Sequence, residues 1–276
     1  DEDRRSVATP PDDRGGQDGD AQDAARTSTY RVYGGEHLAA VPADADVIFG
    51  YDFDDDALGQ LARFTRLQKL DLSGMRPDAR GISTAVPITD AGVAKLATLT
   101  TLRELSLAGC HEVQGTTLAA LREIPRLERL DLAHTGVTSE GLAALPLLPR
   151  LRELSLSGCL AFHGRPLADA AQIPGLRRLE RRGGATVSAA DAVQLAKLHE
   201  LHHLDLGDCM GRFRGQTAVF GLDDVTEGEP PAPPVQDGVG ITDDAVAALA
   251  ALPLEWLSLR GCHRLTDATG AALARM

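Results

Sequence analysis

The sequence predicts one elongated α/β solenoid, with a parallel β-sheet on the concave side and helices on the convex side. One observation is a nine-residue phrase of the form L-x-x-L-x-L-x-x-C, which begins at Leu67, Leu102, Leu127, Leu151, Leu176, Leu201 and Leu254. Another is the spacing of 24 or 25 residues between the middle copies, a period typical of stacked repeats. The third is the stretch after each phrase, where helix-starting residues precede apolar residues at helical spacing.

These registered copies resemble the leucine-rich repeats that carry cysteine at the ninth position, over roughly residues 44–276. The resemblance implies a right-handed leucine-rich-repeat horseshoe. Segments such as Gly141-Leu-Ala-Ala-Leu145 also resemble the repeats of bacterial effectors in which leucine-rich repeats accompany an F-box. No F-box-like helical segment precedes the repeats in this sequence, so the ubiquitin-ligase role of those effectors is not carried over.

Three regions follow one another along the chain. Residues 1–28 are expected to be a disordered acidic tail, because one valine is their only large apolar residue. Residues 29–66 are expected to form the N-terminal cap, a degenerate coil that covers the first full repeat. Residues 67–276 hold seven repeats, interrupted by insertions at 75–87 and 210–240.

Each repeat is expected to form a short strand, a turn and a helix. Because side chains alternate along a strand, positions four and six of the phrase point inward and positions three and five point outward. Thr89, Thr138 and Thr242 stand where helices are expected to begin and can cap their first N–H groups. Both insertions fall between strand and helix and therefore emerge on one rim. They belong either to the binding face or to tolerated surface loops.

All four cysteines occupy position nine of their repeats: Cys110, Cys159, Cys209 and Cys262. There a thiol can hydrogen-bond the backbone from inside the coil, which explains the cysteines without disulfides. Cys110 and Cys159 lie two coils apart, beyond the reach of a disulfide. Cys209 and Cys262 occupy neighbouring coils, and a bridge between them remains an alternative.

The net charge of −12 comes mainly from the tail, from residues 44–56 and from the second insertion. The coils themselves are nearly neutral, which excludes the basic footprint of a nucleic-acid-binding protein. No apolar run reaches the 18 residues or so of a membrane span.

The chain starts at Asp1 rather than Met, so we expect a processed, trimmed or engineered chain. This favours an exported or cell-envelope protein over a cytoplasmic one. The chain stops at Met276 inside the last expected helix, so the C-terminal coil is expected to have a partner or to lack its cap.

Two motifs that look chemical are better explained by structure. His199-Glu-Leu-His-His203 matches a zinc-protease string that requires a helix, yet His203 falls in an expected strand. Asp52-Phe-Asp-Asp-Asp56 resembles the start of a calcium loop, but Ala57 replaces the required glycine and Arg63 the required glutamate. No nucleophile, phosphate or dinucleotide fingerprint is present. We therefore expect no enzyme, no cofactor and no metal.

The outward positions of the strands carry mixed charge along the concave face. Position three reads Lys69, Glu104, Arg129, Glu153, Arg178, His203 and Trp256, and position five includes Asp71, Asp131, Glu180 and Asp205. This pattern suits a polar protein surface as partner. The alternative is a solvated sheet with weak neutralising pairs. Trp256 is either an interface anchor or a side chain covered by the second insertion.

Arg181 occupies position six, where the other six copies have leucine. Because a buried charge is costly, we expect the strand at Leu179 to distort and Arg181 to swing toward solvent. With Arg177, Arg178 and Arg182 it would form a basic spot for an acidic partner. A degenerate repeat without such a role is the alternative.

The sequence therefore favours a non-catalytic module that binds a protein or peptide through the concave sheet and the strand-to-helix rim. The alternative function is a structural or surface-displayed subunit of a larger assembly. The candidate partner-binding residues are Lys69, Asp71, Glu104, Arg129, Asp131, Glu153, Arg178, Glu180, Arg181, Arg182, His203, Asp205 and Trp256.

Overall fold

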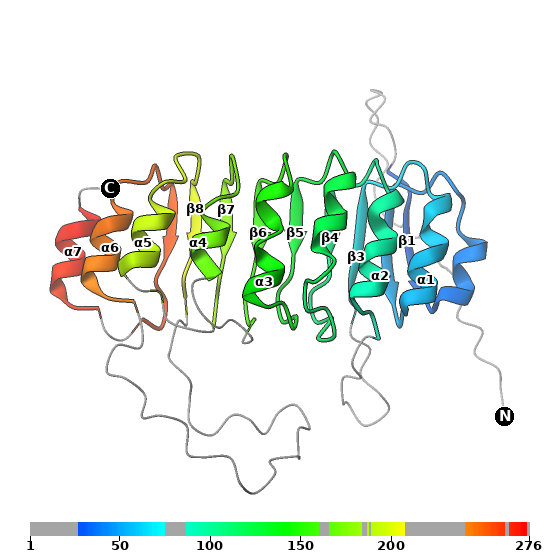
Figure 1. Ribbon diagram of the computed structural model, residues 1–276, viewed down its shortest axis with the longest axis horizontal. Coiled ribbons are helices and arrows are strands. Elements are labelled where there is room, and N and C mark those ends of the chain that lie inside the picture. Colours follow the sequence, from blue (N-terminus) through cyan, green and yellow to red (C-terminus); the bar gives the residue numbers. More distant parts are fainter. Residues whose placement is uncertain are drawn as a thin grey trace, which may run out of the picture.

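The computed structural model describes residues 27–74, 87–159, 166–183, 187, 189–207, 241–262 and 265–274. Within these ranges nine strands form one parallel sheet, and their order in space follows their order in the chain (Figure 1). The strands are β1 (Thr29–Tyr33), β2 (Val47–Tyr51), β3 (Lys69–Gly74), β4 (Glu104–Ser106), β5 (Arg129–Asp131), β6 (Glu153–Ser155), β7 (Arg178–Glu180), β8 (His203–Asp205) and β9 (Trp256–Ser258).

Several parts of the sequence analysis fall outside the described residues. These are the tail up to residue 26, residues 75–86 of the first insertion and the whole second insertion, 210–240. Cys209 lies outside them too, and with it the alternative disulfide to Cys262.

The strands pair in the register that the repeat predicts. The leucines at position four lie opposite one another on successive strands, so they form one ladder through the sheet. The ladder runs Leu70, Leu105, Leu130, Leu154, Leu179, Leu204 and Leu257. The predicted α/β solenoid is confirmed, with each period of the sequence supplying one strand.

Short helices cover one face of this sheet (Figure 1). The α-helices are α1 (Asp55–Gln60), α2 (Asp90–Lys95), α3 (Ser139–Leu142), α4 (Pro166–Ala170), α5 (Ala189–Leu195), α6 (Asp243–Leu249) and α7 (Asp267–Leu273). The 3₁₀ helices are η1 (Gly35–Ala40), η2 (Leu61–Arg63), η3 (Leu96–Thr98), η4 (Leu118–Glu123) and η5 (Leu145–Leu147).

The threonines expected to start helices do cap them. Thr89 accepts a hydrogen bond from the backbone N–H of Ala91 at 3.1 Å, and Thr138 accepts one from Gly141 at 3.3 Å. Thr242 caps α6 in the same way. These caps satisfy N–H groups that have no partner inside the helix, and so they fix where each helix begins.

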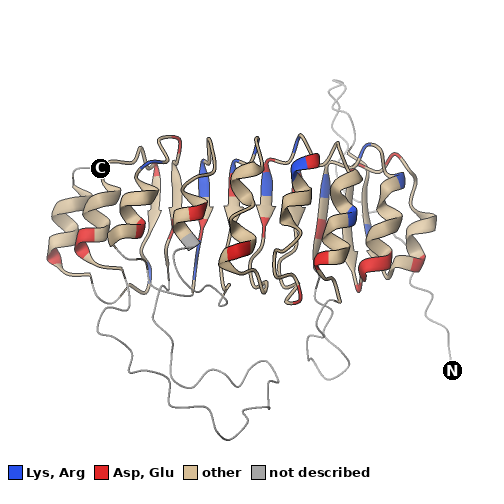
Figure 2. Cartoon of the chain, viewed as in Figure 1, with Lys and Arg blue, Asp and Glu red and all other residues tan. Residues whose placement is uncertain are grey.

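Aspartates in the first helical turn also join neighbouring coils. The Asp55 carboxylate accepts from both the backbone N–H and the hydroxyl of Thr89, at 2.8 and 2.6 Å. Asp243 accepts from the same two groups of Thr266, at 3.0 and 2.6 Å, and these bonds hold the pKa of Asp243 below its usual value. Figure 2 shows acidic residues gathered at one end of the helices, where they also complement the helix dipole.

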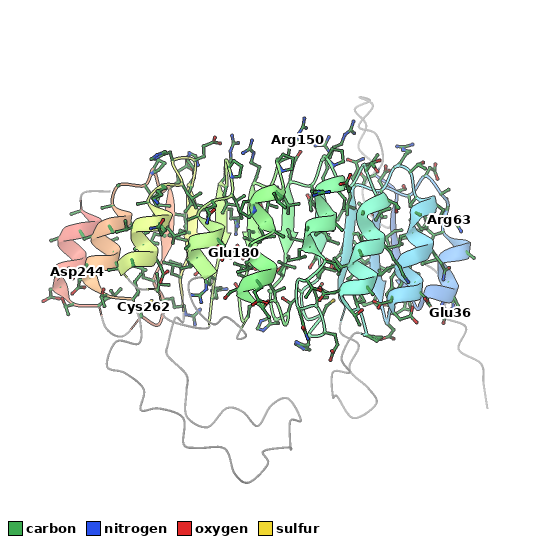
Figure 3. All side chains as sticks on the ribbon, in the orientation of Figure 1. Glu36, Arg63, Arg150, Glu180, Asp244 and Cys262 are labelled. Carbon is green, nitrogen blue, oxygen red and sulfur yellow. The ribbon has the colours of Figure 1, made fainter. Side chains whose placement is uncertain are left out.

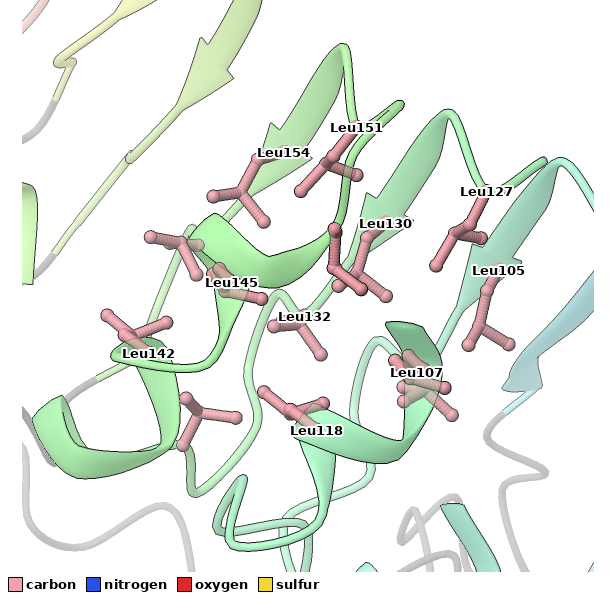
Figure 4. Close-up of a cluster of buried hydrophobic side chains, with 14 of the residues drawn as sticks. Leu105, Leu107, Leu118, Leu127, Leu130, Leu132, Leu142, Leu145, Leu151 and Leu154 are labelled. Carbon is pink, nitrogen blue, oxygen red and sulfur yellow. The ribbon is translucent and has the colours of Figure 1, made fainter. Parts of the chain in front are cut away.

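The core is a set of leucine rows between the sheet and the helices. From Leu67 to Leu206, the leucines at positions one, four and six are at most 2% exposed. Figure 4 shows Leu130 and Leu154 of the sheet facing Leu142 and Leu145 of the helical layer. Burial of one such side chain contributes about 1.5–3 kcal/mol, so the repeated rows supply the main driving force for folding.

The three cysteines that the structure describes at position nine donate hydrogen bonds to the backbone of the preceding coil, as predicted. Cys110 donates to the carbonyl of Leu72 at 3.9 Å, and Cys159 to the carbonyl of Leu132 at 2.9 Å. Cys262 contacts the carbonyl of Leu206 at 3.5 Å. Burial raises the pKa of the Cys110 thiol to about 12 and also raises that of Cys159, so both groups stay protonated. These thiols are packing elements.

The two ends of the solenoid differ in packing. At the N-terminal end, β1 and β2 add two rungs to the sheet, and Val32, Leu38 and Ile48 are fully buried. At the C-terminal end, Leu257 is only partly buried, and Leu273 is 38% exposed. The apolar rows are therefore closed on one side and more open on the other.

The prediction that Arg181 swings into solvent is wrong. β7 keeps its parallel register with β6 and β8, and Arg181 is 1% exposed. The strand does not distort because its backbone stays paired: the N–H of Arg181 donates to the carbonyl of Asp205. The guanidinium charge lies near enough to the Cys159 thiol to lower its pKa, against the larger effect of burial. Strand pairing keeps the side chain in the core.

Candidate functional site: the concave face

The concave face is defined here as the sheet surface that the helices leave uncovered, with the side chains of positions three and five. It holds a hollow of about 290 Å³ that extends from β3 to β7. Its charged and polar lining includes Lys69, Asp71, Ser73, Glu104, Ser106, Arg129, Asp131, Glu153, Ser155, Arg178 and Glu180. The structure thus brings together most of the predicted partner-binding residues on one surface.

Position three forms a chain of alternating charges across four strands. Lys69 pairs with Glu104 at 3.1 Å, and Arg129 bridges Glu104 at 3.1 Å and Glu153 at 3.0 Å. These side chains are between 32% and 54% exposed, so each pair contributes at most about 1 kcal/mol. This chain of ion pairs therefore orders the cationic side chains more than it stabilises the fold.

Position five carries an acid in four of the seven repeats, and it is the last residue of every strand from β4 to β9. Asp71, Asp131 and Asp205 each accept a hydrogen bond from the backbone N–H two residues later, at 2.9–3.0 Å. At Asp131 and Asp205 this bond turns the chain out of the strand, whereas β3 continues past Asp71 to Gly74. Ser106 takes this role more weakly in β4, at 3.4 Å, and its hydroxyl donates to Asp131. The aspartates of this row therefore have a structural use. The second oxygen of Asp131 accepts from Ser106, and that of Asp205 contacts Arg182.

The exposed arginines around β7 are paired with acids. Arg178 contacts Glu180 in the same strand at 2.5 Å, and Arg182 contacts Asp205 at 3.1 Å. Arg177 reaches Glu200 on the rim at 3.3 Å. Three of the four residues of the expected basic spot are therefore neutralised locally, and the fourth, Arg181, is buried.

A stacked pair of rings closes the C-terminal end of the face. The rings of His203 and Trp256 lie parallel, with centroids 3.9 Å apart and an interplanar angle of 8°. Trp256 remains 42% exposed among the described residues, and the insertion that could cover it lies outside them. Burial, and then the charge of Arg178, lower the pKa of His203, so its ring is neutral at physiological pH.

Aromatic residues also occupy the N-terminal end of the face, and sequence reasoning missed them. Tyr33 stacks on Tyr51 with centroids 4.7 Å apart, while the Phe49 ring lies 5.6 Å from the Arg31 guanidinium and 6.0 Å from the Lys69 amine. The cap was expected only to cover the first repeat. The alternation in residues 29–33 and 47–51 was the available signal, because it places these rings on the outward side of two further strands.

The zinc-protease string and the calcium-loop string of the sequence lie in the structural elements expected for them. His203 lies in β8, which cannot present two histidines on one helical face. Asp54 caps α1 by accepting from Ala57 at 2.8 Å, and Asp55 accepts a hydrogen bond from the backbone N–H of Thr89.

In the described part of the chain, no group of three or more His, Cys, Asp or Glu side chains could hold a metal ion. None of the described helices is long and apolar enough to span a membrane.

Comparison with known proteins agrees with the repeat found in the structure. The family model described as Leucine Rich repeat matches residues 125–145, which contain β5 and α3. Residues 125–145 are thus a leucine-rich repeat, and the strands on either side continue its register.

A solved structure of internalin C2 from Listeria monocytogenes str. 4b F2365 is similar at 20% sequence identity. The match covers 66% of this chain and 71% of that chain, with a TM-score of 0.48. No curated protein matches. The leucine-rich repeat indicates a protein-interaction module as the general role.

Proposed function

We propose that this leucine-rich repeat protein binds a protein or peptide through its concave sheet and the adjoining strand-to-helix rim, without catalysing a reaction. The observation that carries the proposal is Trp256, 42% exposed and stacked flat on His203 at the end of the charged hollow. Exposed tryptophans are enriched among the residues that dominate binding energy at interfaces.

A merely solvated sheet explains the ion pairs of position three but not the rings. The aromatic residues at both ends of the concave face, Tyr33, Phe49, Tyr51 and Trp256, offer apolar surface that a solvated sheet does not need. A structural subunit that leaves this face idle would not need them either. The charged middle with aromatic ends fits an interface with polar recognition flanked by apolar anchors.

Selection of ligands from a displayed random-peptide library tests the proposal. Ligands that bind the intact chain are compared on Trp256→Ala and on Leu147→Ala, which truncates another exposed apolar residue, 52% exposed in η5 of the helical layer. We expect Trp256→Ala to weaken the selected ligands by about tenfold or more, as loss of an interface anchor does. Leu147→Ala should leave them nearly unchanged. Ligands that bind both variants as tightly as the intact chain would contradict the proposal.

A further inference from the structure

We propose that the concave face takes a cationic peptide in the polyproline II conformation, with a lysine or arginine at every third residue. Two cationic side chains of the peptide, three residues apart, would lie opposite Asp71 and Asp131. This inference rests on the proposed function and names the chemistry of the partner.

The charges that line the hollow favour a cationic ligand. The bases of position three, Lys69, Arg129 and Arg178, each contact a glutamate within 3.1 Å. Position five adds acids without any base, and no described lysine or arginine lies within ion-pair distance of Asp71 or Asp131. Glu180 is neutralised by Arg178, so Asp71 and Asp131 are the acids of position five in the hollow that still attract a cation.

The spacing of these acids favours a ligand in the polyproline II conformation. Asp71 and Asp131 lie on β3 and β5, with Ser106 on the strand between them. Neighbouring strands are about 4.7–4.9 Å apart, so the acids recur at about 9.4–9.8 Å across the sheet.

A polyproline II helix matches this interval. It has three residues per turn and rises about 3.1 Å per residue, so side chains on one face recur at about 9.3 Å. A β-strand repeats a face at about 6.6–6.8 Å, and two turns of an α-helix rise about 10.8 Å. Over the interval from Asp71 to Asp131, the polyproline II repeat differs from the separation of the acids by about 0.1–0.5 Å, less than either of the other two.

The remaining residues of the face suit the same ligand. A polyproline II backbone makes no internal hydrogen bonds, so its carbonyls can accept from a hydroxyl such as that of Ser155 in the hollow. The Phe49 ring, with Arg31 and Lys69 at its face, shows that the aromatic end already attracts cations. Aromatic rings are also the usual surface on which proline-rich segments dock.

Two synthetic peptides of identical composition test the spacing. One is (Arg-Pro-Pro)₅ and the other carries the five arginines together, followed by the ten prolines. We expect fluorescence anisotropy on the full chain to give a dissociation constant about tenfold lower for the triplet peptide, a difference of about 1.4 kcal/mol. Added salt should weaken both, because exposed charges are screened.

The double variant Asp71→Asn and Asp131→Asn tests the named residues. Asparagine keeps the oxygen that accepts from the backbone two residues later, so the turns are preserved while the charge is lost. The matched control is Asp244→Asn with Asp267→Asn, two exposed acids of α6 and α7 on the helical side (Figure 3 labels Asp244). The first pair should reduce binding of the triplet peptide about tenfold, and the control pair should not. Circular dichroism melting confirms that each variant is folded.

Three outcomes would overturn the inference in different ways. Equal affinity for the two peptides would mean general electrostatic attraction without a register. Equal losses in the two double variants would place the attraction outside the concave face. If neither peptide binds while library ligands still depend on Trp256, the proposed function stands and the cationic ligand is wrong. If the library ligands are also indifferent to Trp256→Ala, the proposed function fails as well.

Discussion

Leu130 and Arg129 are neighbours in β5, yet they belong to opposite faces of the sheet. Leu130 is 1% exposed and lies in a row of identical leucines, whereas the Arg129 side chain is 54% exposed and lies in a row that changes from strand to strand. The buried row is uniform because every coil must fill the same space against its neighbours. The exposed row is free to vary, so it can be adapted to a partner without changing the fold.

Truncating Leu130 and Arg129 to alanine should show the difference between the buried and exposed faces most clearly. Leu130→Ala removes buried methyl groups and leaves a cavity, so we expect a loss of about 2–5 kcal/mol in the free energy of unfolding. Arg129→Ala removes two exposed ion pairs and should cost less than about 1 kcal/mol. Urea unfolding measures both. Comparable losses would contradict the division of roles.

Arg181 is the exception on the buried face, and its replacement should sharpen the comparison. Leu156 and Leu206 occupy the same position in the adjacent coils and are fully buried. Arg181→Leu would remove a buried charge and restore the row, so we expect stability to rise by about 1–4 kcal/mol in the same urea assay. A loss of stability would show that the interactions of Arg181 outweigh the cost of burying it.

Asp131 lies on the exposed face but also shapes the backbone. Asp131→Ala removes the acceptor of the Ala133 N–H and should lower the free energy of unfolding by about 0.5–1.5 kcal/mol. Asp131→Asn keeps an acceptor, so its free energy of unfolding should be close to that of the parent chain. A stable alanine variant and an unstable asparagine variant would refute the proposed use of this carboxylate.

His203 should give the smallest effect, seen as a shift in titration. Its pKa is lowered by burial and by Arg178, so its NMR titration midpoint should fall below the usual histidine pKa of 6.5. Between the folded pKa and 6.5 the unfolded chain binds more protons, so this residue makes stability fall as the pH drops through that range. Arg178→Gln should move the midpoint upward. A midpoint above 6.5 in the parent chain would contradict the stacked arrangement.

The buried face could be predicted almost completely from the sequence. A fixed period of leucines determines the register of the strands, the side of each residue and the place of the position-nine thiols, because stacked coils have one way to bury those rows. Thr89, Thr138 and Thr242 were identified as caps because a helix start leaves the same N–H groups unsatisfied in every coil.

The exposed face could be predicted only as a set of residues. Sequence spacing placed Arg178 and Glu180 on it but did not reveal that they pair with each other. The rings of Phe49 and Tyr51 were missed because the first two strands lack the leucine phrase, although their alternation is regular. Arg181 was misjudged because the cost of a buried charge was weighed without the pairing of its strand on both sides.

Chemical footprinting of carboxylates tests most directly whether the concave face is the binding surface. The full chain is labelled with a carbodiimide and an amine, with and without a library-selected ligand, and the modified residues are quantified by mass spectrometry. We predict that the ligand protects Asp71, Asp131 and Glu153 while labelling of Asp244 on α6 is unchanged. Protection of Asp244 with continued labelling of the three concave carboxylates would contradict the account.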